Sequence, residues 1–124
     1  MLIPVEVHLK NVGVYDMSIN RLLDFRDKIC DKIKKYEDNR YTERVLGLEV
    51  FMNPTPSVRY RWECECLIKI CTIILAREDC DDKSREKCMK DVDNAHKKIK
   101  KGLYSNDMEA LKKYEELKNS KKRF

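Results

Sequence analysis

Residues 56–75 read Pro-Ser-Val-Arg-Tyr-Arg-Trp-Glu-Cys-Glu-Cys-Leu-Ile-Lys-Ile-Cys-Thr-Ile-Ile-Leu, and the fold class depends on whether this stretch is extended or helical. Apolar and polar residues alternate along it. One set comprises Val58, Tyr60, Trp62, Cys64, Cys66, Ile68 and Ile70, and the other Arg59, Arg61, Glu63, Glu65, Leu67 and Lys69. Alternation with a period of two places each set on one face of a strand. We therefore predict a long strand over 58–70 and a further strand over 72–77. One long helix that starts after Pro56 is the alternative.

The flanking segments predict two more strands and two long helices. Residues 6–15 and 44–51 are expected to be strands, and residues 38–42 a polar loop. Between them, Leu22, Phe25, Ile29, Ile33 and Tyr36 share one face of a helix over about 19–36. A second helix is expected to run from caps at 79–82 to about Lys101, where Gly102 ends it. Cys88, Val92, Ala95, Ile99 and Leu103 form its apolar stripe.

The predicted fold is therefore α+β, in the order β-α-β-β-β-α, with one four-stranded sheet and two helices packed on one of its faces. We expect residues 1–104 to form this domain. Residues 105–124, which begin with the capping sequence Ser-Asn-Asp, are expected to form a helical, partly frayed basic tail.

The composition is that of one folded domain rather than a disordered chain. The 124 residues are 40% charged but also 42% hydrophobic, and the charges are mixed in sign, which leaves a net charge of +5. Residues 1–8 lack a basic region followed by an apolar region, so no signal peptide is visible, and the longest apolar run, 70–76, is too short to cross a bilayer. We expect a cytoplasmic protein, without a membrane partner, whose six cysteines are thiols.

Basic residues follow both predicted helices in rows, and they are the strongest functional signal. Arg21, Lys28, Lys32 and Lys35 lie on one side of the first helix, and Lys83, Lys87, Lys90, Lys97 and Lys101 on one side of the second, while Arg59 and Arg61 lie on the predicted strand. Rows of this kind suit a phosphate backbone, although solvated helix faces also favour lysine. We interpret these eleven residues as an RNA-binding surface.

No pattern of residues indicates catalysis. Cys64 and Cys66 share a face that is expected to be core, so we interpret them as buried thiols rather than zinc ligands. The acidic residues at 79–82 suit a helix start, and three glycines leave little material for a phosphate-binding loop. We expect a binding protein without a metal or cofactor, and not an enzyme.

The chain also resembles the ribosome hibernation-promoting factors, or ribosome-associated inhibitors. The likeness covers the helix ending Lys32-Ile33-Lys34-Lys35-Tyr36, the length of the segment 62–82, the position of Ile74-Leu75-Ala76, and a closing basic helix with Lys97, Lys98, Lys100 and Lys101. The resemblance implies a factor that binds ribosomal RNA in the decoding and messenger channel of the small subunit and silences translation.

Two other classes of function stay open. The chain could be a viral or mobile-element module that inhibits a host protein through its tail helix or a sheet edge, without binding nucleic acid. It could instead be a small enzyme or a cyclic-nucleotide binder, which requires a pocket with convergent polar groups.

Overall fold

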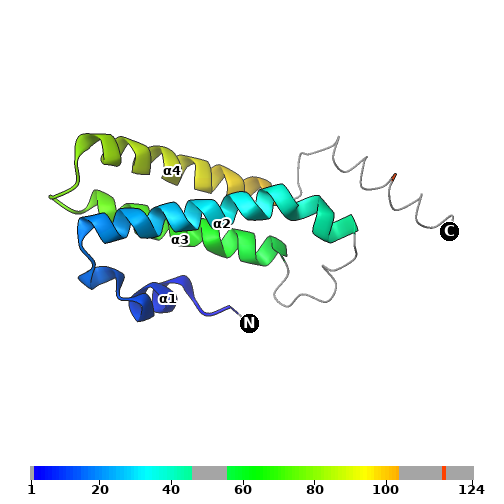
Figure 1. Ribbon diagram of the computed structural model, residues 1–124, viewed down its shortest axis with the longest axis horizontal. Coiled ribbons are helices and arrows are strands. Elements are labelled where there is room, and N and C mark those ends of the chain that lie inside the picture. The colour runs from blue at the N-terminus through cyan, green and yellow to red at the C-terminus, as the bar shows by residue number, and fades with distance from the viewer. Residues whose placement is uncertain (1, 46–55, 104–115, 117–124) are drawn as a thin grey trace.

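The described part of the chain is entirely helical. The computed structural model describes residues 2–45, 56–103 and 116, and within them the elements are α1 (Val5–Val12), the 3-10 turn η1 (Val14–Asp16), α2 (Ile19–Val45), α3 (Pro56–Leu75) and α4 (Asp82–Lys101) (Figure 1). The predicted α+β fold with its four-stranded sheet is therefore wrong, because these residues contain no strand. Over the same residues, no helix combines the length and the apolar character that a membrane span requires.

The alternating stretch is the helix α3, and its burial explains why it resembles a strand. Its buried residues are Pro56, Tyr60, Glu63, Cys64, Cys66, Leu67, Ile70, Cys71 and Ile74. At 100° per residue, those from Tyr60 onward span an arc of about 160°. An arc this wide includes members of both alternating sets, so Leu67 and Ile70 are buried together although a strand would separate them. The helix starting at Pro56, which was the alternative, is the correct interpretation.

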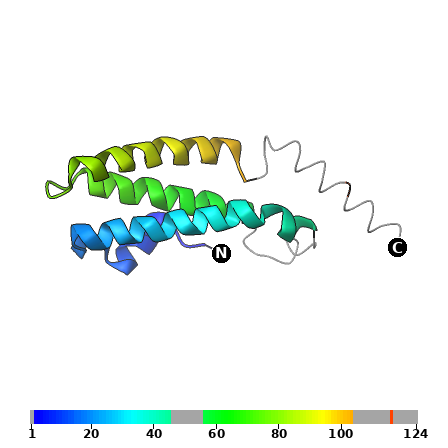
Figure 2. The same ribbon diagram turned by 45° about the horizontal axis from the view of Figure 1, so that its top comes forward.

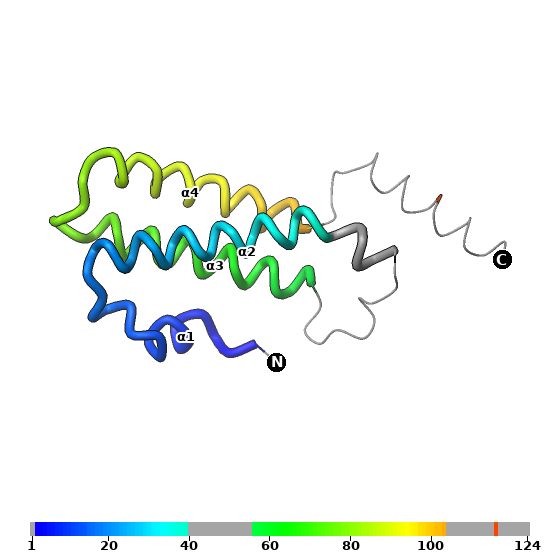
Figure 3. The backbone as a smooth tube through the Cα atoms, in the orientation of Figure 1, coloured from blue at the N-terminus to red at the C-terminus, as the bar shows by residue number. Residues whose placement is uncertain are grey.

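The three long helices form an up-down-up bundle with α3 at its centre. In Figures 1 and 3, α2 and α4 run in one direction and α3 runs in the opposite one. Figure 2 shows the same three helices side by side, with α1 next to the bundle. Among the described elements, α3 packs against α1, α2 and α4. The core accordingly lies along α3, with Leu22, Ile33 and Cys88 contributed by its neighbours.

The N-terminal segment is a short helix and a turn, so the predicted strand over 6–15 is wrong. Gly13 ends α1 in the left-handed conformation, with φ of 86°, and its N–H donates to the carbonyl oxygens of Leu9 and Lys10 at 3.1 Å. Leu9 and Val14 are buried on either side of this glycine. The segment therefore appears to alternate because α1 buries one apolar residue, Leu9, and η1 buries another, Val14.

Helix α2 begins at the predicted residue Ile19 but continues to Val45, so the predicted loop over 38–42 is wrong. Its predicted apolar face is confirmed, since Leu22, Ile29 and Ile33 are buried. The polar residues after Tyr36 extend the helix beside α4, where Lys98 Nζ lies 3.1 Å from Glu37 Oε1. Of the predicted strand over 44–51, residues 44 and 45 are helical and the others lie outside the described residues.

Hydrogen bonds from an arginine side chain to backbone carbonyl groups hold the connection between α3 and α4. The predicted strand over 72–77 is wrong, because Thr72 to Leu75 form the last turn of α3. Arg85 then donates to the carbonyl oxygens of Leu75, Arg77 and Cys80, at 2.9 Å for Leu75 and 3.2 Å for Cys80. The bond to Leu75 satisfies a carbonyl group that the end of α3 leaves without a partner, and the other two bonds fix the connection that follows.

Helix α4 is the helix predicted from the sequence. The Asp81 carboxylate accepts a hydrogen bond from the Ser84 N–H at 2.7 Å, and this bond lowers the pKa of Asp81. Gly102 follows the last helical residue, Lys101. The predicted stripe is confirmed: Cys88, Ala95 and Leu103 are buried, and Val92 and Ile99 pack against the core. The predicted tail, 105–124, and the domain boundary at 104 lie outside the described residues, apart from residue 116.

A buried ion pair joins α2 to α4. The Arg26 side chain is only 5% exposed, and its guanidinium bonds Asp91 of α4, with Nε 2.5 Å from Oδ2, and Asp27 of its own helix. Burial opposes the charge on Arg26, but the two carboxylates outweigh it and the pKa of Arg26 is raised. Arg26 therefore stays charged inside the bundle and requires Asp91 beside it.

Replacing Asp91 should cost much more stability than replacing a nearby exposed aspartate. We expect Asp91→Ala to lower the free energy of unfolding by about 3 kcal/mol, because Arg26 would remain buried without its main partner. The control Asp93→Ala, two residues along the same helix and exposed, should cost under about 0.5 kcal/mol. Urea denaturation followed by circular dichroism measures both, and equal losses would contradict the role assigned to the pair.

Candidate polyanion-binding surface

The charges of the described residues are segregated along the bundle. Because α3 runs opposite to α2 and α4, the ends of α2 and α4 meet the start of α3 at one end of the molecule (Figure 1). We define the basic end as residues 32–39, 56–65 and 94–101. It holds nine lysines and arginines against four acidic residues. Residues 2–31 and 66–93 hold ten basic residues against twelve acidic ones. The positive charge of the described residues thus gathers at one end.

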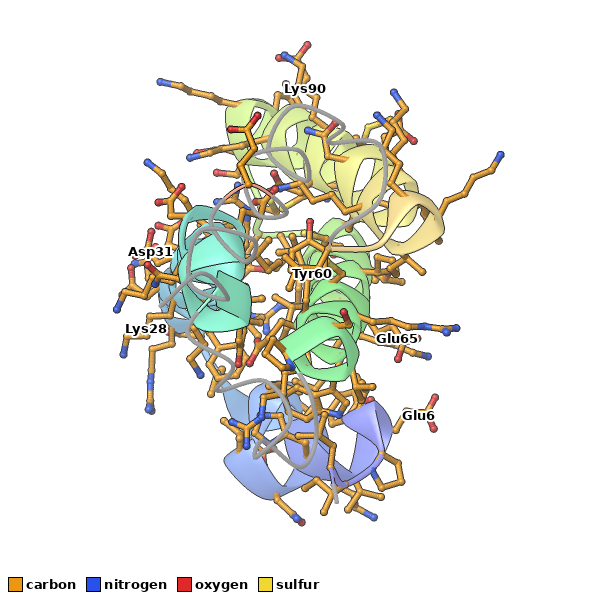
Figure 4. The ribbon with its side chains drawn as sticks, turned by 90° about the vertical axis from the view of Figure 1, so that its right-hand side faces the viewer. Glu6, Lys28, Asp31, Tyr60, Glu65 and Lys90 are labelled. Atoms are coloured by element: carbon orange, nitrogen blue, oxygen red, sulfur yellow. The ribbon has the colours of Figure 1, made fainter. Side chains whose placement is uncertain are left out.

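The eleven predicted RNA-binding residues are all exposed, but they divide between two regions. The basic end contains Lys32, Lys35, Arg59, Arg61, Lys97 and Lys101. The other five, Arg21, Lys28, Lys83, Lys87 and Lys90, lie outside it. Figure 4 shows Lys28 on the outer side of α2 and Lys90 on the outer side of α4, away from each other. Position along the bundle, rather than membership of a helical row, therefore brings the basic residues together.

A cleft of about 410 Å³ lies between α2 and α3 at the basic end. Its described lining comprises Lys32, Lys35, Tyr36 and Asn39 from α2 and Arg59 and Glu63 from α3. Three of the predicted basic residues thus share one concave site. The other three lining residues were not predicted as site residues.

Glu63 is the unusual member of this cleft, because it is a carboxyl group that is only 7% exposed. Burial raises its pKa, and the positive charge of Lys32 opposes that rise. Lys32 also lowers the pKa of His8 of α1, although burial of the imidazole is the larger cause. The side of α2 that carries Lys32 therefore faces α1 and α3 as well as solvent.

A second cleft, of about 390 Å³, lies between the start of α3 and the end of α4. Arg61, Lys98 and Lys101 contribute its positive charge, and Tyr60 and Leu103 contribute apolar surface. In Figure 4 the Tyr60 side chain extends between the helices, toward the inside of the bundle. Because Tyr60 is only 3% exposed, the α2–α3 cleft, with the half-buried Tyr36, is the one of these two clefts that combines basic side chains with an accessible aromatic ring, an arrangement that suits phosphates and bases.

The cysteines are part of the core rather than a reactive site. Cys64 and Cys66 are buried, as predicted, but on a helix rather than a strand. Burial raises the pKa of each thiol to about 12, so both are protonated at neutral pH and are poor nucleophiles. Within the described residues, no group of three or more His, Cys, Asp or Glu side chains is placed to hold a metal ion.

The two histidines lie in separate surroundings. His8 packs its ring 4.8 Å from that of Trp62, tilted by 54°, and Trp62 Nε1 donates to the Ile3 carbonyl oxygen at 2.7 Å. These contacts fasten the N-terminal segment to α3. His96 is exposed on α4.

Comparisons with models of protein families, with curated proteins and with solved structures found no match to this chain. The resemblance to hibernation factors relied partly on an order of strands that the described residues do not have. The basic residues quoted for it remain, because Lys32 and Lys35 line the α2–α3 cleft and Lys97 and Lys101 end α4.

The sequence did not predict Tyr36, Asn39 and Glu63 as site residues, and the reasons can be identified. Tyr36 was assigned to the apolar face of its helix, and Glu63 to the polar face of a strand. A helical period would have placed Glu63 beside Tyr60 and Leu67, three and four residues away, and so on the buried side. Asn39 lies in the segment that was predicted to be a loop.

Removing the charge of Glu63 should stabilise the protein at neutral pH. A carboxyl group whose pKa is raised by folding binds its proton more tightly in the folded state, so stability falls as pH rises from 4.5 through the folded-state pKa. We therefore expect Glu63→Gln to raise the melting temperature by a few degrees at pH 7. The difference from the parent protein should disappear below pH 4.5.

The control is Glu65→Gln, on the same helix but paired with Arg61 at 3.2 Å, with a side chain that is 42% exposed. It should leave the melting temperature unchanged or slightly lower at both pH values, because solvent-accessible ion pairs contribute little. A Glu63→Gln variant that melts below the parent at pH 7 would show that the buried carboxylate stabilises the fold.

Proposed function

We propose that this protein binds single-stranded RNA through its basic end and acts by occupying the strand, without catalysing a reaction. The observation that carries the proposal is the segregation of charge: nine basic residues on three helices gather at one end, while residues 2–31 and 66–93 are slightly acidic. A phosphate backbone is attracted to such a surface and releases its counterions when it binds.

Helix stability alone does not account for the basic end. Lysines in the last turn of α4 interact favourably with the helix dipole, and Lys98, Lys100 and Lys101 lie there. Arg59, however, lies in the first turn of α3, where the dipole favours acidic residues. Basic residues therefore lie both at a helix C-terminus, where they stabilise the helix, and at a helix N-terminus, where they do not. This indicates that their positive charge has a role at the protein surface beyond helix stability.

A single strand fits this surface better than a duplex. At the basic end, the α2–α3 cleft is lined by the exposed Lys32 and Lys35 and by the half-buried ring of Tyr36. Unpaired bases can enter such clefts and stack on aromatic rings, whereas the bases of a duplex are already stacked and paired. Ribosomal RNA, the partner implied by the resemblance, is included in the proposal as one source of unpaired strand.

A second candidate function, a protein-interaction module, is favoured by the N-terminal segment. Ile3, Val7, Val12 and Tyr15 are between 39% and 66% exposed there. Exposed apolar side chains grouped on one segment are typical of a protein-binding surface. This function predicts purification without nucleic acid and binding that persists at high salt, whereas RNA binding through the basic end should weaken steeply with salt.

The charge of the basic end can be tested against equal charge elsewhere on the same helix. We expect the double variant Lys97→Gln/Lys101→Gln to bind a fluorescein-labelled 20-nucleotide RNA of mixed sequence on the order of tenfold more weakly than the parent. Anisotropy titrations at several salt concentrations should also show a shallower dependence on salt, by about 0.7 in logarithmic slope for each phosphate that the variant no longer neutralises.

The matched control, Lys83→Gln/Lys87→Gln, removes the same charge from the first half of α4 and should bind like the parent protein. If both double variants bound RNA equally weakly, the loss would be due to net charge and not to the basic end. An RNA affinity that does not change with salt concentration would contradict the proposal. Ribosomal RNA would be identified as the source of the strand if the parent and the Lys83/Lys87 variant co-sedimented with ribosomes at low salt and the Lys97/Lys101 variant did not.

A further inference from the structure

The α2–α3 cleft combines two chemistries that seldom share one small site. Glu63 supplies a carboxyl group that is 7% exposed, while Lys32, Lys35 and Arg59 supply exposed positive charge around it. A volume of about 410 Å³ is within the range of small-molecule sites. The ligand that suits this cleft must therefore satisfy both groups at once.

The carboxyl group of Glu63 is short of hydrogen-bond donors. Among the described residues, Glu63 interacts electrostatically with Lys32 and with the neighbouring thiols of Cys64 and Cys66, and no described group donates a hydrogen bond to it. A buried acceptor that lacks a donor is costly to the folded state. A ligand that offers N–H groups to Glu63 would remove this cost.

The rim of the cleft imposes the opposite requirement. A polyamine or another simple cation would satisfy Glu63 but would be repelled by the lysines, and an inorganic phosphate would suit the lysines but would be repelled by Glu63 when it is ionised. The two requirements together describe a ligand with N–H donors at one end and an anionic group at the other.

We infer that the α2–α3 cleft binds one guanine nucleotide, with the base directed to Glu63 and the phosphate to the lysines of α2. Guanine presents two adjacent N–H donors, N1–H and the N2 amino group, to the two oxygens of one carboxylate. Tyr36 offers a ring against which the base can stack, and Lys32 and Lys35 lie on the same helix to hold the phosphate. Asn39 adds a further polar group at the lining.

This inference rests on the proposed function where the nucleotide belongs to an RNA strand, but a free nucleotide has the same chemistry. The test therefore uses both. Isothermal titration with guanosine, inosine and uridine 5′-monophosphates measures the free ligands, since inosine monophosphate differs from the guanine nucleotide by the N2 amino group alone. Anisotropy compares a uridine 12-mer with the same strand carrying one central guanine.

We expect guanosine monophosphate to bind about tenfold more tightly than inosine monophosphate, or the strand with one guanine to bind about tenfold more tightly than the uridine 12-mer. Glu63→Gln should abolish that preference, whereas Glu65→Gln, on the same helix and with a side chain that is 42% exposed, should retain it. The Glu63→Gln chain removes an unfavourable buried charge, so loss of folding is not expected to obscure the result, and circular dichroism checks it.

Each outcome separates the two proposals. A preference for guanine in the free nucleotides, with no RNA binding, keeps the cleft assignment and overturns the proposed function. RNA binding that depends on Lys97 and Lys101, with no guanine preference in either series, keeps the function and overturns the assignment. A preference that persists in Glu63→Gln also overturns it, because the selecting group would then lie elsewhere.

Discussion

The structure depends on the burial of α3 over about 160° of its circumference. A helix that packs against one neighbour needs only a narrow apolar stripe, but α3 packs against α1, α2 and α4. Its buried arc must therefore hold side chains of several kinds, from Ile70 and Ile74 to the small thiols of Cys64 and Cys71. The small residues let the neighbouring helices approach, and the position of every other helix follows from that approach.

Among the described residues, Arg26 and Glu63 are the two charged residues that are buried, and their surroundings differ. Arg26 has carboxylates beside it on its own helix and on α4, so its charge is retained and links two helices that α3 separates. Glu63 has Lys32 nearby, but no described donor bonds it. Arg26 therefore links two helices of the bundle, whereas the burial of Glu63 is a cost to the fold.

The sequence predicted the helices that have one apolar stripe and failed where burial has another form. The residues of α2 and α4 follow a period of 3.6, and the caps at Asp81 and Gly102 mark the ends of α4. In α3 a narrow stripe with a period of 3.6 cannot be recognised. Its wide buried arc includes residues of both alternating sets, so the sequence pattern resembles that of a strand. In α1 only Leu9 is buried, and a single residue cannot define a period.

The candidate site shows a similar division. All eleven predicted basic residues are exposed, and six of them meet at the basic end, but which six depends on the direction of each helix in the bundle. That direction follows from the fold, which was predicted wrongly from the sequence. Glu63 could be recognised as a buried carboxyl group only once Tyr60 and Leu67 were known to share its side of a helix.

If the basic end binds RNA as proposed, the uneven distribution of charge among the described residues would also orient the protein on the strand. Residues 2–31 and 66–93 are slightly acidic, so their charge and that of the basic end together would favour an approach to RNA with the basic end first. Helix α4 has 20 residues and so extends about 30 Å, while the cross-section of three helices is about 20 Å. Molecules bound by their ends would stand upright on a strand and could line it at intervals set by their width rather than their length.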